Sequence, residues 1–188
     1  MIPPEDVSDS ELATQSLRDP ERFAFLVERY SAKLFRYVGR VTRLPIDHLE
    51  DIVQDIFLKA YRGLASYNPQ LPFSSWIYRI AHNESISFLR KHKHNLHVAS
   101  LDIDDRIVAH LADVQQDAID TFTKKKVNDA LAQLPEKYAA VLVLYFFEDK
   151  DYESISDILK VPAGTVATRL RRGKQKLNQL LSEYSSDL

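Results

Sequence analysis

"VPAGTVATRLRRGKQKL", residues 161–177, holds five basic residues and no acidic one, in a chain of formal net charge -2. Here and just beyond, Val166, Leu170, Gly173, Leu177 and Leu181 follow one another at steps of four, three, four and four. This spacing predicts a helix with one buried stripe. The basic residues are left on the remaining surface, where they can meet a polyanion.

The segment before this helix predicts a second, shorter one. Asp151 can cap it, and the apolar residues Tyr152, Ile155, Ile158 and Leu159 follow at helical steps. "KVPAG" then breaks the chain for only a few residues. Two helices across a tight turn, the second basic and longer, are typical of a DNA-reading helix-turn-helix. The alternative is a solvated basic face, but the adjoining helix and the absence of acids favour DNA binding.

The composition predicts an all-α protein of one or two small domains. The chain has 188 residues, 45% of them hydrophobic, and only four glycines. Without cysteine it can form no disulfide, thiolate metal site or cysteine nucleophile. Its N-terminus lacks the apolar core of a secretory signal, and no apolar run approaches the roughly 20 residues that span a bilayer. We therefore expect a cytosolic protein.

The pattern along the chain predicts two all-helical domains joined by a linker. Helical periodicity runs through residues 23–41, Pro45 interrupts it, and further helices are expected from about Glu50 to Gly63 and over 73–92. Residues 98–121 hold six aspartates against one arginine, which favours a flexible acidic linker. We predict domains at 11–93 and 123–184, with the linker at 94–122.

Both predicted domains resemble parts of one family. "LAQLPEKYAAVLVLYFFEDKDYESISDILKVPAGTVATRLRRGKQKL" (131–177) resembles region 4 of bacterial RNA polymerase sigma factors of the extracytoplasmic-function group, within the sigma-70 family. "EDIVQDIFLKAYRGLASYN" (50–68) and "FSSWIYRIAHNESISFLRK" (73–91) resemble region 2. The resemblance implies a transcription initiation factor that binds core RNA polymerase, directs the polymerase to promoter DNA and helps to melt that DNA. It also implies an anti-sigma factor, which can hold the chain at the inner membrane face. Catalysis belongs to the polymerase, so we expect no enzyme activity.

By this resemblance the basic helix reads the upstream (−35) element as duplex. Arginine can bond guanine bidentately, and lysines can meet phosphates. The candidate residues are Thr165, Ala167, Thr168, Arg169, Arg171, Arg172, Lys174 and Lys176. Three positions depart from the family pattern and leave the promoter sequence open. Lys160 stands where glycine is frequent and Ala167 where a basic residue is common, while Gly173 costs roughly 1 kcal/mol within a helix.

Region 2 by resemblance captures the downstream (−10) element as a single strand. That task needs aromatic faces for bases, polar groups for base edges and cations for phosphates. The candidates are Tyr67, Asn68, Trp76, Arg79, His82, Asn83, Ser87, Arg90 and Lys91. The resemblance places an extruded base near Tyr67 and Asn83. A lone tryptophan at a helical step is more often core, so Tyr67 is the better stacking candidate; Tyr78 is also expected on the exposed side.

The helix after Pro45 predicts a docking face. Its core stripe comprises Ile52, Val53, Ile56, Phe57, Ala60 and Leu64. The opposite face and its flanks hold Asp51, Gln54, Asp55, Leu58, Lys59 and Arg62, which the resemblance assigns to core-polymerase binding. The alternative is a solvated face with one exposed leucine.

Metal and catalytic sites find little support in the sequence. Glu50, Asp51 and Asp55 lack further converging ligands, and His92, His94 and His97 lack helical i, i+4 spacing. We expect no metal, no cofactor and no small-molecule substrate. A stand-alone helix-turn-helix regulator is the main alternative function, and an enzyme is a distant third because no nucleophile motif or phosphate loop is present.

Overall fold

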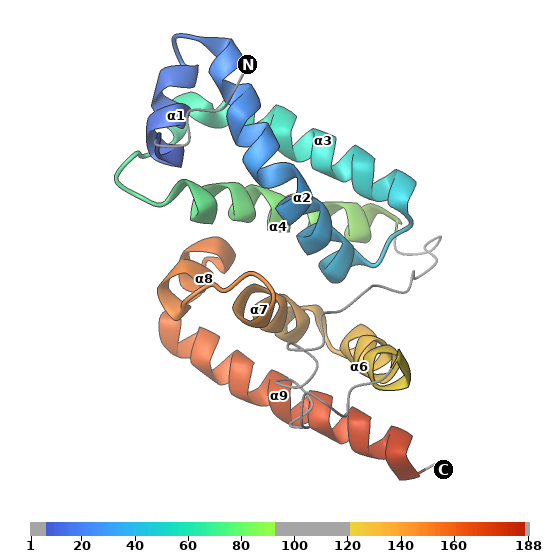
Figure 1. Cartoon of the computed structure of the whole chain (residues 1–188). Coiled ribbons are helices and arrows are strands. Elements are labelled where there is room, and N and C mark those ends of the chain that lie inside the picture. The colour runs from blue at the N-terminus through green and yellow to red at the C-terminus, as the bar shows by residue number, and fades with distance from the viewer. Residues whose placement is uncertain (1–6, 93–120, 187–188) are drawn as a thin grey trace. The chain divides into compact units, whose positions relative to one another are not determined.

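The computed structural model describes residues 7–92 and 121–186, and within these ranges every regular element is a helix (Figure 1). The chain divides into two compact units, one N-terminal and one C-terminal. None of the described helices is long and apolar enough to cross a membrane. The predicted all-α fold with two helical domains is confirmed. The predicted linker lies outside the described residues except for its last two positions.

The N-terminal unit is built on three long helices that pack against one another. They are α2 (Phe23–Thr42), α3 (Ile46–Gly63) and α4 (Phe73–His92), with the short helix α1 (Asp9–Ser16) packed on α2 and α4. Single 3-10 turns, η1 (Pro20–Arg22) and η2 (Leu64–Ser66), lie before α2 and after α3. Apolar side chains at helical steps, among them Leu26, Leu34, Ile56 and Ile77, are fully buried. Their burial drives the packing.

The turn between α2 and α3 lies where Pro45 predicts it. Arg43 ends α2 in the left-handed region, with φ 56° and ψ 35°, and its amide donates to the carbonyl of Gly39 at 2.7 Å. Pro45 is the N-cap of α3. The helix thus begins at Ile46 rather than near Glu50, because a proline is well tolerated at a helix start, where its missing N–H has no partner to lose.

The C-terminal unit contains α6 (Thr121–Gln133), α7 (Glu136–Phe146), α8 (Tyr152–Leu159) and α9 (Ala163–Ser186). α7 is largely buried, since Val141, Leu142 and Leu144 have no exposed surface. It packs on α9, as does α6. The predicted stripe of α9 is confirmed at Val166 and Leu177, which are also fully buried.

The predicted helix-turn-helix is present as α8 and α9. The Asp151 carboxylate accepts from the amide of Ser154 at 2.7 Å and so caps α8. Lys160 ends α8 in the left-handed region, with φ 53° and ψ 47°. The turn therefore takes the backbone conformation that favours glycine, but with a lysine in it.

Gly173 has a packing role in the middle of α9. A β-carbon built there would lie 3.3 Å from Cδ1 of Leu142 and 3.4 Å from Cβ of Tyr138, both on α7. Glycine therefore lets α9 approach α7 closely. This contact offsets the helix propensity that glycine gives up at this position.

Candidate nucleic-acid and protein interfaces

The basic residues of α9 lie where a DNA duplex can reach them. Arg171, Arg172 and Lys176 are exposed, and Arg169 and Lys174 are half-buried. Thr168 is also exposed, and its hydroxyl donates to the carbonyl of Gly164 at 2.8 Å. The remaining two candidates, Thr165 and Ala167, are half-buried near the start of the helix. All eight predicted upstream-DNA residues thus lie on α9 between Thr165 and Lys176.

A second helix adds a cation to this basic face. A shallow pocket of about 250 Å³ is lined by Lys137 and Tyr138 of α7 together with residues of α9 that include Arg169 and Arg172. The Lys137 ammonium lies 5.2 Å from the centre of the Tyr138 ring. Sequence reasoning missed Lys137, because no helical periodicity links a lysine at the start of α7 to arginines on α9.

Most of the predicted single-strand residues share one face of α4. At 100° per residue, Trp76, Arg79, Asn83, Ser87 and Arg90 fall on the same side of the helix. Asn83, Ser87 and Arg90 are exposed, as is Lys91, while Trp76 and Arg79 are half-buried. Among the residues that the structure describes, the buried Nε of Arg79 has no hydrogen-bond partner. Aromatic, amide, hydroxyl and guanidinium groups therefore lie along one stripe.

Two other residues of α4 face the core. Tyr78 is only 2% exposed and meets the ring of Tyr37 edge-on at 5.2 Å, so the expectation that Tyr78 is exposed was wrong. His82 is half-buried, and its Nδ1 lies 3.1 Å from the Tyr37 hydroxyl. This bond ties His82 to α2, about a third of a turn away from the stripe of Asn83. A DNA contact by His82 stays a prediction.

Tyr67 is buried in the loop before α4. Its side chain is 8% exposed, and its ring lies 5.4 Å from Phe73 and 5.3 Å from Trp76. Stacking on a base needs an accessible aromatic face, so a base contact by this largely buried ring stays a prediction. Asn68, the next residue, is exposed at the tip of the loop. Of the two predicted loop residues, Asn68 is the more exposed.

The predicted docking face of α3 is exposed along its length. Asp51, Gln54, Asp55 and Arg62 all lie in solvent, and Leu58 keeps 45% of its surface accessible. Lys59 is exposed as well, but its ammonium pairs with Glu84 of α4 at 2.5 Å. The acids therefore dominate the charge beside Leu58.

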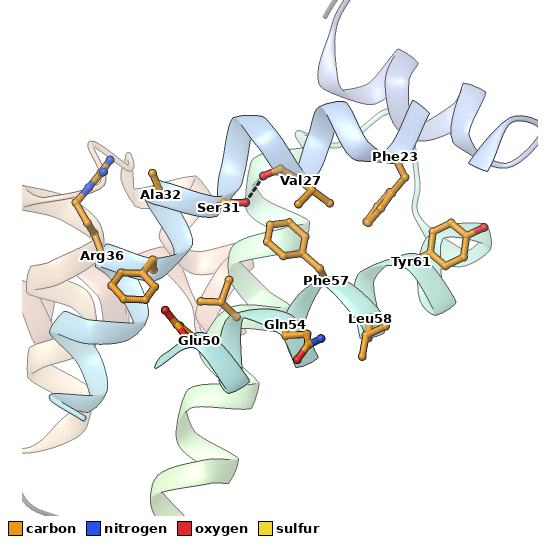
Figure 2. Close-up of a pocket in the computed structure, with 12 residues that line it drawn as sticks. Phe23, Val27, Ser31, Ala32, Arg36, Glu50, Gln54, Phe57, Leu58 and Tyr61 are labelled. Atoms are coloured by element: carbon orange, nitrogen blue, oxygen red, sulfur yellow. Dashed lines mark hydrogen bonds between the residues drawn. The ribbon is translucent and has the colours of Figure 1, made fainter. Parts of the chain in front are cut away.

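An open apolar groove of about 750 Å³ runs between α2 and α3 (Figure 2). We call it the α2–α3 groove; its apolar lining comprises Phe23, Val27, Ala32, Phe35, Val53, Phe57, Leu58 and Tyr61. Ser31, Arg36, Glu50 and Gln54 complete the lining. Gln54 and Leu58 belong both to the groove and to the predicted docking face.

The groove corrects two core assignments. Val53 and Phe57 were expected to be buried but are half-exposed. Phe23 makes edge-on contacts across the groove, 6.5 Å from Phe57 and 5.2 Å from Tyr61. Such an aromatic-lined groove is suited to the apolar side chains of a partner helix.

The histidine and carboxylate alternatives have no geometric support in the described ranges. Residues 7–92 and 121–186 contain no group of three or more His, Asp or Glu side chains that could hold a metal ion. His92 stacks on Phe88 with ring centres 4.2 Å apart. His94 and His97 lie outside the described residues.

Comparison with known sequences assigns both units to described families. A family model described as Sigma-70 region 2 matches residues 26–95, and one described as Sigma-70, region 4 matches 124–177. The ECF RNA polymerase sigma factor SigW of Bacillus subtilis is 30% identical over 172 residues, which are 88% of this chain and 91% of the relative. The ECF RNA polymerase sigma-E factor of Haemophilus influenzae is 31% identical over 170 residues, 85% of this chain and 87% of that one.

Solved structures share the fold. CnrH in complex with the cytosolic domain of CnrY matches with a TM-score of 0.69 at 23% identity, over 93% of this chain and 97% of that chain. The sigma factor RpoE of Bartonella quintana, in complex with the anti-sigma factor NepR, matches with a TM-score of 0.66 at 21% identity, over 86% and 98% of the two chains.

Proposed function

The chain belongs to the extracytoplasmic-function group of RNA polymerase sigma factors, and on that premise we propose which surfaces perform each task of such a factor. It is a transcription initiation factor, which binds core RNA polymerase, directs it to promoters and assists their melting. The surfaces proposed below divide these tasks between the two units.

Core polymerase docks on the N-terminal unit. The docking surface consists of the α2–α3 groove and the adjoining face of α3, with Asp51, Asp55, Leu58 and Arg62. The single observation that carries this proposal is the groove, because monomeric proteins rarely leave a large aromatic-lined surface open without a partner. Apolar side chains of a polymerase helix fill the groove, and its basic side chains meet the acids of α3.

The upstream element is read by α9. Arg171 and Arg172 are the exposed arginines of its first half and are the proposed base contacts. Lys174 and Lys176, farther along, contact phosphates. Lys137 of α7 joins them, since it shares a pocket with Arg172.

The downstream strand lies along the stripe of α4. Asn83 and Ser87, both exposed, offer groups for base edges, and the half-buried Trp76 offers an aromatic side chain to a base. Arg79, Arg90 and Lys91 lie near the backbone phosphates. Asn68 completes the pocket from the loop before α4. Its side-chain oxygen accepts from the Gln70 amide, so its Nδ2 hydrogens are the donors that it offers to the strand.

The proposed domain boundaries follow from these assignments. Residues 11–93 carry polymerase and strand binding, 123–184 carry duplex binding, and 94–122 join them. Thirty or so residues can stretch to about 100 Å. Two promoter elements about 25 base pairs apart are separated by roughly 85 Å. The linker is thus long enough for both units to contact DNA together.

An anti-sigma factor is the proposed regulatory partner. RpoE, which shares this fold, was solved with the anti-sigma factor NepR. In this chain the α2–α3 groove is the apolar surface that such a partner would cover, and occupation of the groove would exclude the polymerase. We place the protein in the cytoplasm, where bacterial polymerase and promoter DNA are found. Retention at the inner membrane face would require a membrane-anchored partner.

A stand-alone regulator is the second candidate, because α8 and α9 form a complete helix-turn-helix. In vitro transcription with purified core polymerase separates the two. An initiation factor gives promoter-specific transcripts, and Asp55→Arg weakens polymerase binding without unfolding the chain. A regulator binds the promoter duplex tightly but yields no transcript. Synthesis itself stays with the polymerase, and we propose no catalytic residue in this chain.

A further inference from the structure

The hydroxyl of Tyr67 joins the N-terminal helix to the loop before α4. The Tyr67 oxygen lies 2.7 Å from Oγ of Ser10 on α1, and it donates to the carbonyl of Leu71 at 2.6 Å. Since a phenol carries one hydrogen and the carbonyl takes it, the serine hydroxyl must be the donor in the other bond. The three groups form a chain of hydrogen bonds from Ser10 through Tyr67 to Leu71.

This chain fixes a loop that is already shaped by its own backbone. The Leu71 amide donates to the carbonyl of Asn68 at 3.0 Å, and the Gln70 amide donates to the side-chain oxygen of Asn68 at 3.0 Å. Pro69 sits at the second position of this turn, where its fixed φ is favoured. Tyr67 holds both ends of the turn, because its ring is packed at one end and its hydroxyl bonds the other.

α1 is anchored firmly to α2, so it can act as the fixed end of this hydrogen-bond chain. Asp9 accepts from Arg29 at 2.8 Å and from the Tyr30 hydroxyl at 2.5 Å, both on α2. Burial, with the Asp9 carboxylate beside it, raises the pKa of Tyr30 far above its ordinary value, so the phenol remains a donor at any working pH. Leu12 and Ala13 of α1 are buried in the core.

We infer that the hydrogen-bond chain Ser10–Tyr67–Leu71 makes α1 a positioning element for the strand pocket, which sets the base preference of the loop 67–72. Ser10 and Tyr67 are positioning residues in this account, and neither touches the DNA. The inference rests on the proposed strand-binding role of the loop and α4. It assigns to α1 a part in promoter selection, through a contact between residues 57 positions apart in the sequence.

The test uses the full chain bound to core polymerase, with fork-junction DNA whose single-stranded −10 bases are changed one at a time. Ser10→Ala and Tyr67→Phe each remove one hydroxyl and leave the aromatic packing in place. We expect each to reduce the preference for the best base at the position that contacts the loop by about 3- to 10-fold, the scale of one lost hydrogen bond. Ser10→Thr keeps the hydroxyl and should restore the preference.

Thr14→Ala is the matched control, since its hydroxyl also lies on α1 but donates to a backbone carbonyl of the same helix, that of Ser10. It should leave the preference within twofold of the wild type. If the contact only stabilised the fold, its loss would lower the melting temperature and weaken binding to all DNA sequences alike. The ratio of affinities between bases would then not change.

Asn83→Ala separates the inference from its premise. If Asn83→Ala weakens strand binding while Ser10→Ala and Tyr67→Phe keep the wild-type ratio, the positioning role of α1 is refuted and the strand-binding face survives. If Asn83→Ala and Asn68→Ala both bind the strand like the wild type, the proposed strand-binding role is refuted, and the inference with it.

Discussion

The basic face of α9 and the α2–α3 groove, the two proposed binding surfaces, are of opposite kinds. The first is charged, and it comes largely from one helix, with Arg171, Arg172 and Lys176 all exposed. The second is concave and apolar, and it exists only because two helices leave Val53 and Phe57 partly uncovered. The difference supports the proposed division of labour, in which the basic face of α9 meets a polyanion and the α2–α3 groove meets a protein.

If this division is correct, substitutions in one surface should leave the other's function intact. Leu58→Glu places a charge at the edge of the groove, where a buried apolar contact is expected to form. We expect the affinity for core polymerase to fall at least 30-fold, or about 2 kcal/mol, as for an interface hot spot. Titration of labelled core polymerase measures it.

Leu17→Glu is the control for this variant, because Leu17 is a similarly exposed leucine, 54% accessible, at the end of α1. It should bind polymerase like the wild type. Equal losses in the two variants would mean that the groove is not the docking surface.

Arg172→Ala tests the basic face of α9. A bidentate base contact is worth about 1–3 kcal/mol at one base pair, so discrimination should relax at a single position of the upstream element. Holoenzyme binding to a promoter library measures this, and core-polymerase affinity should not change. A uniform loss across all sequences would show that Arg172 contacts a phosphate instead.

Asp151→Ala tests whether the two units are independent in stability. Loss of the cap of α8 should destabilise the C-terminal unit by about 1 kcal/mol, and Asp151→Asn should cost less. The single tryptophan, Trp76, lies in the N-terminal unit. Its fluorescence transition should therefore be unchanged while the circular dichroism transition moves to lower denaturant. A shift of both transitions together would mean that the units unfold as one.

The same cap predicts a pH dependence. The hydrogen bond from the Ser154 amide lowers the pKa of Asp151 below its usual value. The stabilisation is thus fully present above the ordinary carboxyl pKa and is lost as the pH falls through the lowered folded value. The stability difference between the wild type and Asp151→Asn should shrink below about pH 4, as followed by urea unfolding at several pH values.

Lys137→Gln tests the cation that α7 adds to the DNA surface. The loss of one phosphate contact should reduce the magnitude of the slope of log K for DNA binding against log salt concentration by about 0.9. It should weaken binding to all duplex sequences equally. Lys33→Gln is a matched control, since Lys33 also lies over a tyrosine ring, 5.5 Å from that of Tyr30, but in the other unit. Identical salt slopes in the two variants would remove Lys137 from the interface.

Lys160→Gly should produce the smallest effect. Lys160 has φ 53°, and relief of this strain should stabilise the C-terminal unit by a few tenths to about 1 kcal/mol, because glycine's greater entropy when unfolded offsets part of the gain. Chemical denaturation measures the change. Destabilisation would mean that the lysine side chain contributes more than the backbone strain costs.

The same contrast explains what could be predicted from the sequence. The stripe of α9 depends on one helix alone, so Val166 and Leu177 could be assigned to the core from their spacing. The bounds of α4, Phe73–His92, also agree with the prediction, since a proline loop precedes the helix. Local signals of this kind, together with the cap at Asp151, predicted most of the fold.

Features that depend on how two helices pack together could not be predicted from the sequence. Periodicity indicates which side of α3 faces inward, but the open space beside α2 depends on how the helices pack, so Val53 and Phe57 were assigned to the core. Tyr67 was predicted to stack on a base, and nothing local in the sequence shows that its hydroxyl bonds Ser10 and its ring lies beside Trp76. The base contact itself stays a prediction. His82 likewise bonds Tyr37, 45 positions away.

Permanganate footprinting of a promoter tests the division of labour most directly. The account predicts reactive thymines in the −10 element only when this chain and core polymerase are both present, and none with Leu58→Glu, although that variant still binds the −35 duplex like the wild type. Protection of the promoter by the chain alone, with no melting when polymerase is added, would contradict it.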